Sequence, residues 1–306
     1  SWPSVDRGEP AARALRRIVL RQLEVAEAQM EGLRADLDSE FCHDLRVAVR
    51  RTRALLAQLK RALAPGEIEG LRAELAWLGR ETGPLRDLDV LAIELRTLDP
   101  ELADGLEPLV ELIEQRRREA HARVLEVLDS ERWRDLRSAW RRWGQGAAPA
   151  TESLFGVLVA DRVARLYRRI RREGARLGPD APADDLHALR IDCKKLRYLL
   201  ECAREAAAIE EQRRCVRALK GLQQVLGDFN DAQLQAGELE ALAGALAERE
   251  PLALLPLGRL VEHRRDGERA ARAGFSERFE AFAARRSRRD FERLEAVLRG
   301  GEALAR

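Results

Sequence analysis

The stretch HDLRVAVRRTR at residues 43–53 recurs as HALRIDCKKLR at residues 187–197, an offset of 144 residues. In each copy a histidine is followed by an arginine three residues later, then by two adjacent basic residues and an arginine at the eleventh position. A helix turns by about 100° per residue, so the first, fourth, eighth and eleventh positions fall within roughly 80° of one another. Each copy therefore predicts a helix with one cationic face.

We call these faces the first and the second stripe. The first stripe consists of His43, Arg46, Arg50, Arg51 and Arg53, and the second of His187, Arg190, Lys194, Lys195 and Arg197. A rise of about 1.5 Å per residue spreads each stripe over about 15 Å, which suits an extended polyanion better than one small phosphate. Leucines occupy the opposite side of both helices: Leu45, Leu55, Leu56, Leu59 and Leu63, and Leu189, Leu196, Leu199 and Leu200. Each helix thus has a core face and a basic face.

The overall composition indicates a helical protein whose charges are locally segregated. Of the 306 residues, 35% are charged and 5% aromatic, as in long amphipathic helices. The formal net charge is only +2, which disfavours a wholly basic coat that binds nucleic acid non-specifically. Residues 43–61 nevertheless carry six lysines or arginines and one acidic residue. An anion site is therefore expected from local clustering.

Cysteine spacing and hydropathy set further limits on the function. The cysteines Cys42, Cys193, Cys202 and Cys215 show no Cys-x-x-Cys spacing, so we expect neither a disulfide framework nor a metal site, and we expect no cofactor. The most apolar run, residues 252–260, is short and contains Pro256 and Arg259. These features predict a cytoplasmic protein that neither enters a membrane nor is exported.

Helical periodicity predicts an all-α fold of two four-helix bundles that arose by internal duplication and are related by a pseudo-twofold. The first repeat is expected at residues 11–143 and the second at residues 151–299. Breaks are expected at Gly83-Pro84, at Gly227 and, weakly, at Gly274. The expected helices cover residues 11–37, 42–64, 67–97, 101–142, 152–176, 184–208, 210–246 and 252–299.

Together with LKGLQQVLGDFND at residues 219–231, the two stripes make the chain resemble the CHAD family, the conserved histidine alpha-helical domain. The resemblance covers nearly the whole chain. It implies two four-helix bundles around a basic central channel, binding of inorganic polyphosphate without an assigned catalytic activity, and a location at polyphosphate granules. The expected ligands are both stripes together with Lys60, Arg116, Lys220 and Arg264.

The chemistry of the stripes agrees with this expectation. Arginine binds phosphate oxygens bidentately and lysine acts as a mobile point charge. The pKa of a histidine rises beside bound phosphates, so affinity should grow as the pH falls. Many cations on facing helices repel one another, and Asp87, Asp89 and Asp231 are the carboxylates expected to hold some of them.

Other functions remain open at this point. The basic faces could simply be solvated, and His43 and His187 could pack or cap at a bundle end. An enzyme acting on phosphoanhydrides would use His43 or His187 as phosphoacceptor or acid, usually with a metal held by carboxylates. Specific recognition of nucleic acid is not expected, because Tyr167 and Tyr198 lie outside any aromatic-rich motif and Trp133, Trp140 and Trp143 share one helical face typical of a core. The oligomeric state does not follow from the sequence.

Overall fold

The computed structural model describes residues 2–147, 153–178, 180–204, 206–207 and 209–301. Its regular elements in these ranges are helices, which confirms the all-α prediction. The first half contains α1 (Ala11–Glu27), α2 (Met30–Arg34), α3 (Ser39–Gln58), η1 (Lys60–Ala62), α4 (Glu69–Glu81), α5 (Gly83–Arg96), α6 (Pro100–Ala103), α7 (Glu107–Asp129) and α8 (Glu131–Gln145). The second half contains α9 (Phe155–Gly174), α10 (Ala183–Cys202), α11 (Ile209–Arg249), η2 (Pro251–Ala253), α12 (Leu254–Ala283) and α13 (Arg285–Leu298).

Each half contains a bundle of four helices with the same order of neighbours. In the first, α1 packs on α3 and α8, and α4 packs on the same two helices. In the second, α9 packs on α10 and α13, and α11 packs on those two as well. The expected four-helix architecture is therefore present in both halves. Its origin by duplication, and the repeat boundaries at residues 11–143 and 151–299, remain predictions.

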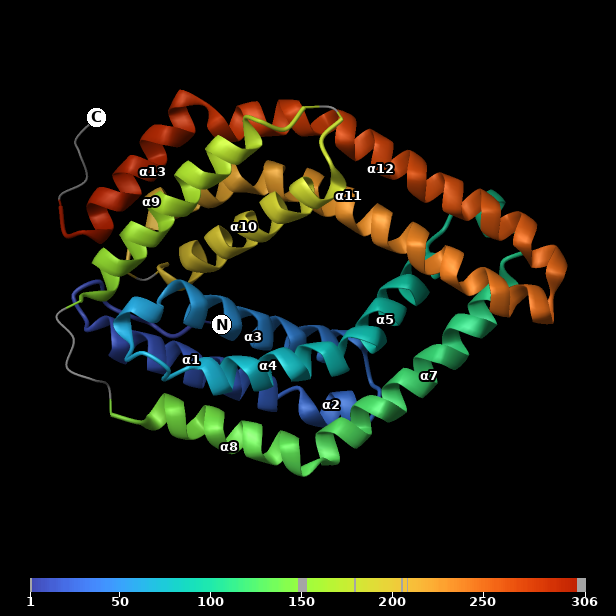
Figure 1. Ribbon diagram of the computed structural model, residues 1–306, viewed down its shortest axis with the longest axis horizontal. Coiled ribbons are helices and arrows are strands. Elements are labelled where there is room, and N and C mark those ends of the chain that lie inside the picture. The colour runs from blue at the N-terminus through green and yellow to red at the C-terminus, as the bar shows by residue number, and fades with distance from the viewer. Residues whose placement is uncertain (1, 148–152, 179, 205, 208, 302–306) are drawn as a thin grey trace.

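The two halves share a further core at the end of the molecule remote from the bundles. Helices α5 and α7 leave the first bundle and pack against each other, while the C-terminal part of α11 packs on α12 (Figure 1). Buried side chains of all four helices form one cluster, which includes Leu91, Leu109, Ile113, Leu239, Leu246 and Leu260. The chain therefore closes into a ring, with the bundles on one side and this distal core on the other.

Several predicted helix boundaries differ from the structure. The expected helix over residues 11–37 divides into α1 and α2, and the one over residues 101–142 divides first between α6 and α7. The expected break at Gly227 is wrong, because α11 continues through it as one helix of 41 residues. The expected helix over residues 101–142 divides again at Ser130, whose extended backbone and side chain cap α8 by accepting a hydrogen bond from the Trp133 amide at 3.1 Å. The last helix divides at Ala284 and not at Gly274.

Two other sequence expectations, a break at Gly83-Pro84 and a core position for the tryptophans Trp133 and Trp140, are confirmed. The break at Gly83-Pro84 is confirmed, since α4 ends beside Thr82 and α5 begins at Gly83. Trp133 and Trp140 are buried core residues, and the Trp140 indole donates to the carbonyl of Val19 at 2.9 Å. Within the described residues, no helix is both long and apolar enough to cross a lipid bilayer.

Candidate functional site

The two stripes face each other across the contact between the halves. Helix α3 carries the first stripe, α10 carries the second, and the two helices pack together. The Arg50 Nε donates to the Tyr198 hydroxyl at 2.7 Å, and Arg51 forms an ion pair with Glu201 at 3.0 Å. The stripes therefore contribute to one shared site.

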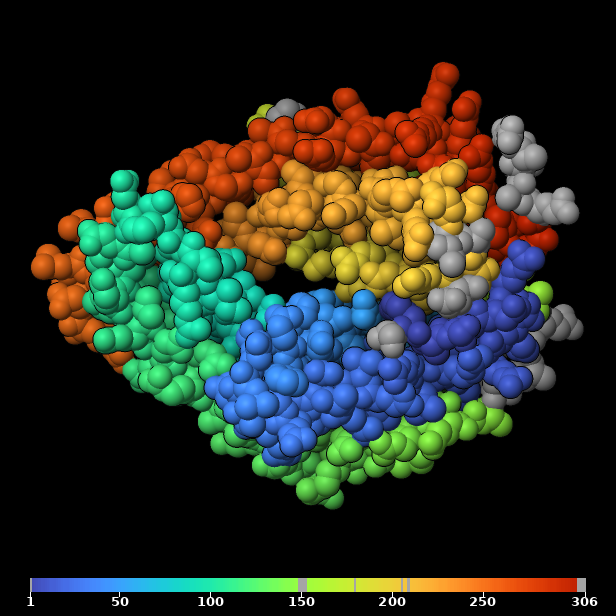
Figure 2. Space-filling model, turned by 180° about the vertical axis from the view of Figure 1, so that it is seen from behind, coloured from blue at the N-terminus to red at the C-terminus, as the bar shows by residue number. Residues whose placement is uncertain are grey.

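A cavity of about 330 Å³ opens beside this contact, between α3, α5, α10 and α11. Figure 2 shows the corresponding hollow between the blue and green first half and the yellow and orange helices of the second. We call this space the central cavity. Its charged and polar lining consists of His43, Arg46, Arg50, Arg86, Asp87, Arg190, Lys194, Asn230, Asp231, Gln235 and Glu238.

Short polar contacts fix several of these groups. The Arg46 guanidinium donates to the Gly79 carbonyl at 2.6 Å and to the Thr82 hydroxyl at 2.9 Å, which ties the first stripe to the end of α4. Arg190 pairs with Asp231 at 3.1 Å. His187 lies at the cavity margin, where its Nδ1 is 2.7 Å from Asn230 Oδ1. These side chains are thus oriented before any ligand arrives.

The positively charged side chains of the central cavity lie close enough together to repel one another. Burial, followed by the neighbouring Arg190 and Arg50, lowers the pKa of Lys194 to about 8. Burial also lowers the pKa values of Arg46 and Arg190. The pKa of His43 is lowered by burial and by the positive charge of Arg86. A polyanion would relieve this repulsion, so each of these pKa values would rise on binding.

Carboxylates occupy one part of the same cavity. Burial, together with the charges of Asp87 and Glu94, raises the pKa of Glu238 to about 7. The pKa of Asp87 is raised by desolvation, although Arg46 and Arg86 oppose the shift. The cavity therefore becomes more positive as Glu238 takes up a proton near neutral pH.

The structure places the other predicted ligands outside the central cavity. Lys195 pairs with Asp192 at 2.8 Å and Arg197 with Glu201 at 2.6 Å. Arg53 is an exposed residue of α3. Partial desolvation lowers the pKa of its guanidinium, and the positive charges of Arg72 and Arg80 lower it further. Arg51 also lies over the Trp2 ring, with 5.0 Å between the guanidinium carbon and the ring centroid.

Four predicted ligands lie farther along the fold. Lys60 is exposed on η1 and Arg116 is half-buried on α7. Arg264 pairs with Glu94 at 3.2 Å. Lys220 lines a separate groove of about 590 Å³ between α11 and α12. The central cavity thus gathers His43, Arg46, Arg50, Arg190 and Lys194 from the predicted set.

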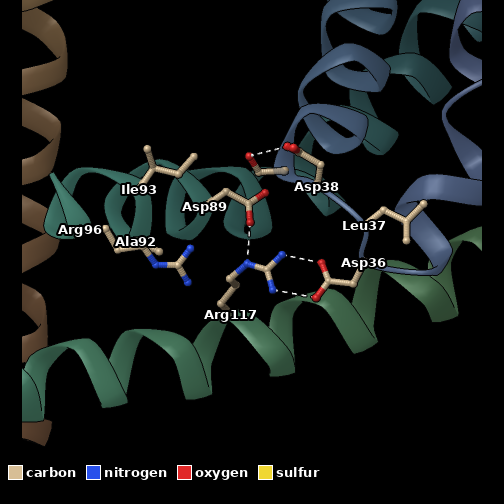
Figure 3. A pocket seen from close by; sticks show the side chains of 9 residues that line it. Asp36, Leu37, Asp38, Asp89, Ala92, Ile93, Arg96 and Arg117 are labelled. Carbon is tan, nitrogen blue, oxygen red and sulfur yellow. Dashed lines mark hydrogen bonds and ion pairs between the residues drawn. The ribbon is translucent and has the colours of Figure 1, made fainter.

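The expected counterions divide in the same way. Asp231 pairs with Arg190, as expected for a carboxylate that holds the second stripe. Asp89 instead pairs at 2.7 Å with Arg117, which also binds Asp36 (Figure 3). These residues line a different pocket of about 430 Å³ between α5, α7 and the start of α3. Asp89 therefore belongs to a separate ion-pair cluster, in which burial raises its pKa although Arg117 opposes the shift, and it is not the partner of a stripe residue.

Sequence reasoning missed several lining residues. Arg86 adds a cation from α5, while Asn230, Gln235 and Glu238 come from α11. Arg86 and Asn230 belong to the short motifs LRD at residues 85–87 and FND at residues 229–231, which lie 144 residues apart, and this offset was the available signal. Gln235 and Glu238 carried none, because their position depends on the path of α11 past Gly227.

The potential metal-binding side chains are dispersed. Among the described residues, no three histidines, cysteines or carboxylates are grouped so that they could hold a metal ion. The thiols of Cys42, Cys193, Cys202 and Cys215 are buried and free.

The sequence is similar to a known protein family and to known proteins. The family model for the CHAD domain matches residues 17–240. Two uncharacterized proteins of Mycobacterium tuberculosis are each 29% identical over 237 residues, or 73% of this chain. The chain spans 44% of the length of each of these relatives.

Two solved structures share the fold. The crystal structure of the CHAD domain from the plant Ricinus communis aligns with a TM-score of 0.72 at 24% identity, covering 99% of this chain and 96% of that one. The structure of PptA from Streptomyces chartreusis aligns with a TM-score of 0.66 at 20% identity, covering 89% of this chain and all of the other.

Proposed function

The chain belongs to the CHAD domain family, and from this membership and the central cavity we propose that it binds inorganic polyphosphate without altering it chemically. The observation that carries the proposal is the convergence of five cations, Arg46, Arg50, Arg86, Arg190 and Lys194, on one cavity. They come from α3, α5 and α10, which lie in both halves of the chain.

A linear polyphosphate fits this arrangement because it offers a row of anionic oxygens with neither base nor sugar. Arg50 and Lys194 form no ion pair within the described part of the chain, so both charges are available to a ligand. Arg46 and Arg190 are held by hydrogen bonds and can meet phosphate oxygens with their remaining N–H groups. The role of each residue is to bind and orient the anion.

An enzyme acting on phosphoanhydrides is the second candidate. It is favoured by His43, whose lowered pKa keeps the imidazole neutral, and therefore nucleophilic, beside a cluster of cations. This reaction would release phosphate and would depend on His43, whereas binding alone would not. A nucleic-acid partner is disfavoured because Tyr167 and Tyr198 are both buried and neither ring is free to stack on a base.

Calorimetric titration with long-chain polyphosphate tests the proposal, with single-stranded RNA at the same phosphate concentration and ionic strength as the reference. We expect tight binding of polyphosphate, weaker binding of RNA, and no phosphate release in the same samples. Release that disappears in His43→Gln would establish the enzyme instead. RNA binding equal to that of polyphosphate would indicate a nucleic-acid partner.

Cytoplasmic localisation at polyphosphate granules is part of the same proposal, because a protein that binds the polymer would concentrate where the polymer accumulates. A fluorescent fusion imaged together with stained granules tests it. The fusion should co-localise with the granules, and charge reversal at Arg50 and Lys194 should disperse it.

A further inference from the structure

A further pocket lies between α9 and α13. These two helices pack side by side at one edge of the molecule (Figure 1). The pocket has a volume of about 290 Å³. Its polar lining comprises Tyr167, Arg168 and Arg171 from α9, and Arg288, Glu292 and Glu295 from α13. We call it the α9–α13 pocket. It shares no lining residue with the central cavity.

Two buried donors in this pocket lack acceptors. Tyr167 is only 5% exposed, and its hydroxyl has no hydrogen-bond partner within the described residues. The buried Nε of Arg171 likewise has none there. Leaving such a group unsatisfied costs about 1–3 kcal/mol, so an unmet buried donor calls for an explanation. Here two of them occur in the same pocket.

The Tyr167 ring is held firmly. It stacks on Phe291, with 4.0 Å between centroids, and meets Phe282 edge-on at 5.2 Å. Burial raises the pKa of its hydroxyl to about 12, so the group remains a protonated donor at neutral pH. The charges of Arg171, Arg288 and Glu292 also act on this hydroxyl, which places it near the charged lining.

The arginines leave positive charge uncompensated. Arg288 pairs with Glu292 at 2.8 Å, and Glu295 pairs with Arg299 at 3.0 Å. Neither Arg168 nor Arg171 forms an ion pair with the part of the chain that the structure describes. The two carboxylates of the lining, Glu292 and Glu295, are thus paired with other arginines, and the guanidinium groups of Arg168 and Arg171 have no carboxylate partner among the described residues.

We propose that the α9–α13 pocket binds a compact phosphate anion, of the size of phosphate or pyrophosphate, through Tyr167, Arg168 and Arg171. Several oxygens on one anion can accept from both guanidinium groups, and a small displacement of the lining would bring one of them to the buried phenol. The volume equals that of about ten water molecules at about 30 Å³ each, which accommodates such an anion. The source is either free pyrophosphate or the end of a polyphosphate chain.

The experiment is a titration of the whole chain with inorganic pyrophosphate. Tyr167→Phe keeps the ring stack and removes the hydroxyl, and Arg168→Gln combined with Arg171→Gln removes the free charges. Arg172→Gln is the matched control, because Arg172 lies on the same helix and pairs with Glu173 outside the pocket. Arg50→Glu combined with Lys194→Glu disables the central cavity.

We expect both pocket variants to raise the Kd for pyrophosphate at least about tenfold, in line with the loss of a hydrogen bond to a charged group. Arg172→Gln and the central-cavity variant should retain the affinity of the unmodified chain. Pyrophosphate should also raise the melting temperature of the unmodified chain but not that of Tyr167→Phe, whose melting temperature without ligand should be higher than that of the unmodified chain because the unsatisfied buried hydroxyl is gone.

Absence of pyrophosphate binding, or full binding by the two pocket variants, would overturn the proposal, as would loss of binding in the central-cavity variant. Long-chain polyphosphate identifies the source. Residual polyphosphate binding by the central-cavity variant that disappears when Tyr167→Phe is added shows that the pocket takes a chain end. Pyrophosphate binding without such residual binding shows that it takes the free anion.

Discussion

The Nε of Arg50 on α3 donates to the hydroxyl of Tyr198 on α10 at 2.7 Å, a contact that joins residues 148 positions apart. Because the Tyr198 ring is buried, it acts as a fixed acceptor. The contact sets the orientation of the Arg50 guanidinium at the wall of the central cavity and leaves its terminal nitrogens for a ligand. It links the two halves at the site that both of them build.

Tyr198→Phe tests this link. The substitution keeps the ring and removes the acceptor, so we expect the free energy of unfolding to fall by about 1 kcal/mol. We expect polyphosphate affinity to fall about fivefold, because Arg50 must then be ordered during binding. Urea denaturation measures the free energy of unfolding and calorimetry measures the affinity. If neither changes, the contact contributes to neither stability nor binding.

Reversing one charge in each stripe should weaken polyphosphate binding strongly. Arg50→Glu combined with Lys194→Glu places two carboxylates in the central cavity, and we expect affinity to fall at least about a hundredfold, since each charged hydrogen bond contributes about 1.5–3 kcal/mol. The helical content measured by circular dichroism should be unchanged, because neither side chain belongs to the core.

A matched control for this pair reverses Arg134 and Arg286, which are exposed residues outside the central cavity. The net charge changes by the same amount, so binding that depended only on total charge would weaken equally in both proteins. We expect the control to bind nearly as well as the unmodified chain at the same ionic strength. Intact binding by the stripe variant would refute the assignment of the cavity.

Polyphosphate affinity should decrease as the pH rises. A bound polyanion raises the pKa of each neighbouring group, so binding takes up protons, and the affinity is greatest where these groups are already protonated. Without ligand, the pKa of Glu238 is about 7 and that of Lys194 about 8. The affinity should therefore begin to fall near pH 7 and continue to fall through and above pH 8. Titrations from pH 6 to pH 9 measure this profile, and a flat profile would contradict it.

Glu238→Gln isolates the acidic part of that profile. The amide cannot ionise, so we expect higher affinity than in the unmodified chain at pH 8 and equal affinity at pH 6, where Glu238 is already mostly protonated. Glu240→Gln is the control, because Glu240 lies on the same helix, is exposed and pairs with Arg265. A gain of the same size in both variants would show a general effect of charge.

Arg117→Ala should destabilise the protein without weakening polyphosphate binding. The Asp89 side chain is 1% exposed, and removing Arg117 leaves its carboxylate buried without a cation. Breaking a buried ion pair in this way costs about 3–5 kcal/mol. Urea denaturation should show this loss, and replacing Asp89 with Asn in the same protein should restore part of it. A stable single variant would indicate that the pair contributes little.

Local signals predicted most of the helices but not all of their ends. Gly227 was expected to break α11 because glycine costs about 1 kcal/mol in a helix relative to alanine. The contacts of α11 with α10, α12 and α13 outweigh that cost, and such contacts cannot be read from a local window. The break at Ser130 did carry a signal, since serine is a favoured N-cap. The break at Ala284 carries neither glycine nor proline.

The candidate site could be predicted only in part, because local sequence signals do not show which helices pack together. Periodicity identifies the basic face of α3 and of α10, and it also includes residues such as Arg53, which the structure leaves outside the cavity. Only the packing of α5 and α11 against these helices brings in Arg86 and Glu238. The α9–α13 pocket had no sequence signal, because its character depends on donors left without acceptors after folding.

The length of α11 has a mechanical consequence. At about 1.5 Å per residue its 41 residues form a rod of about 60 Å that belongs both to the second bundle and to the distal core. A continuous helix resists bending and stretching, so this rod acts as a strut along one side of the ring (Figure 1). Widening the opening for a thicker guest requires the strut to flex or the distal core to come apart. The width of the opening therefore depends on the stiffness of α11 as well as on the charges around it, and substitutions at the remote end of the rod would alter how readily the ring opens.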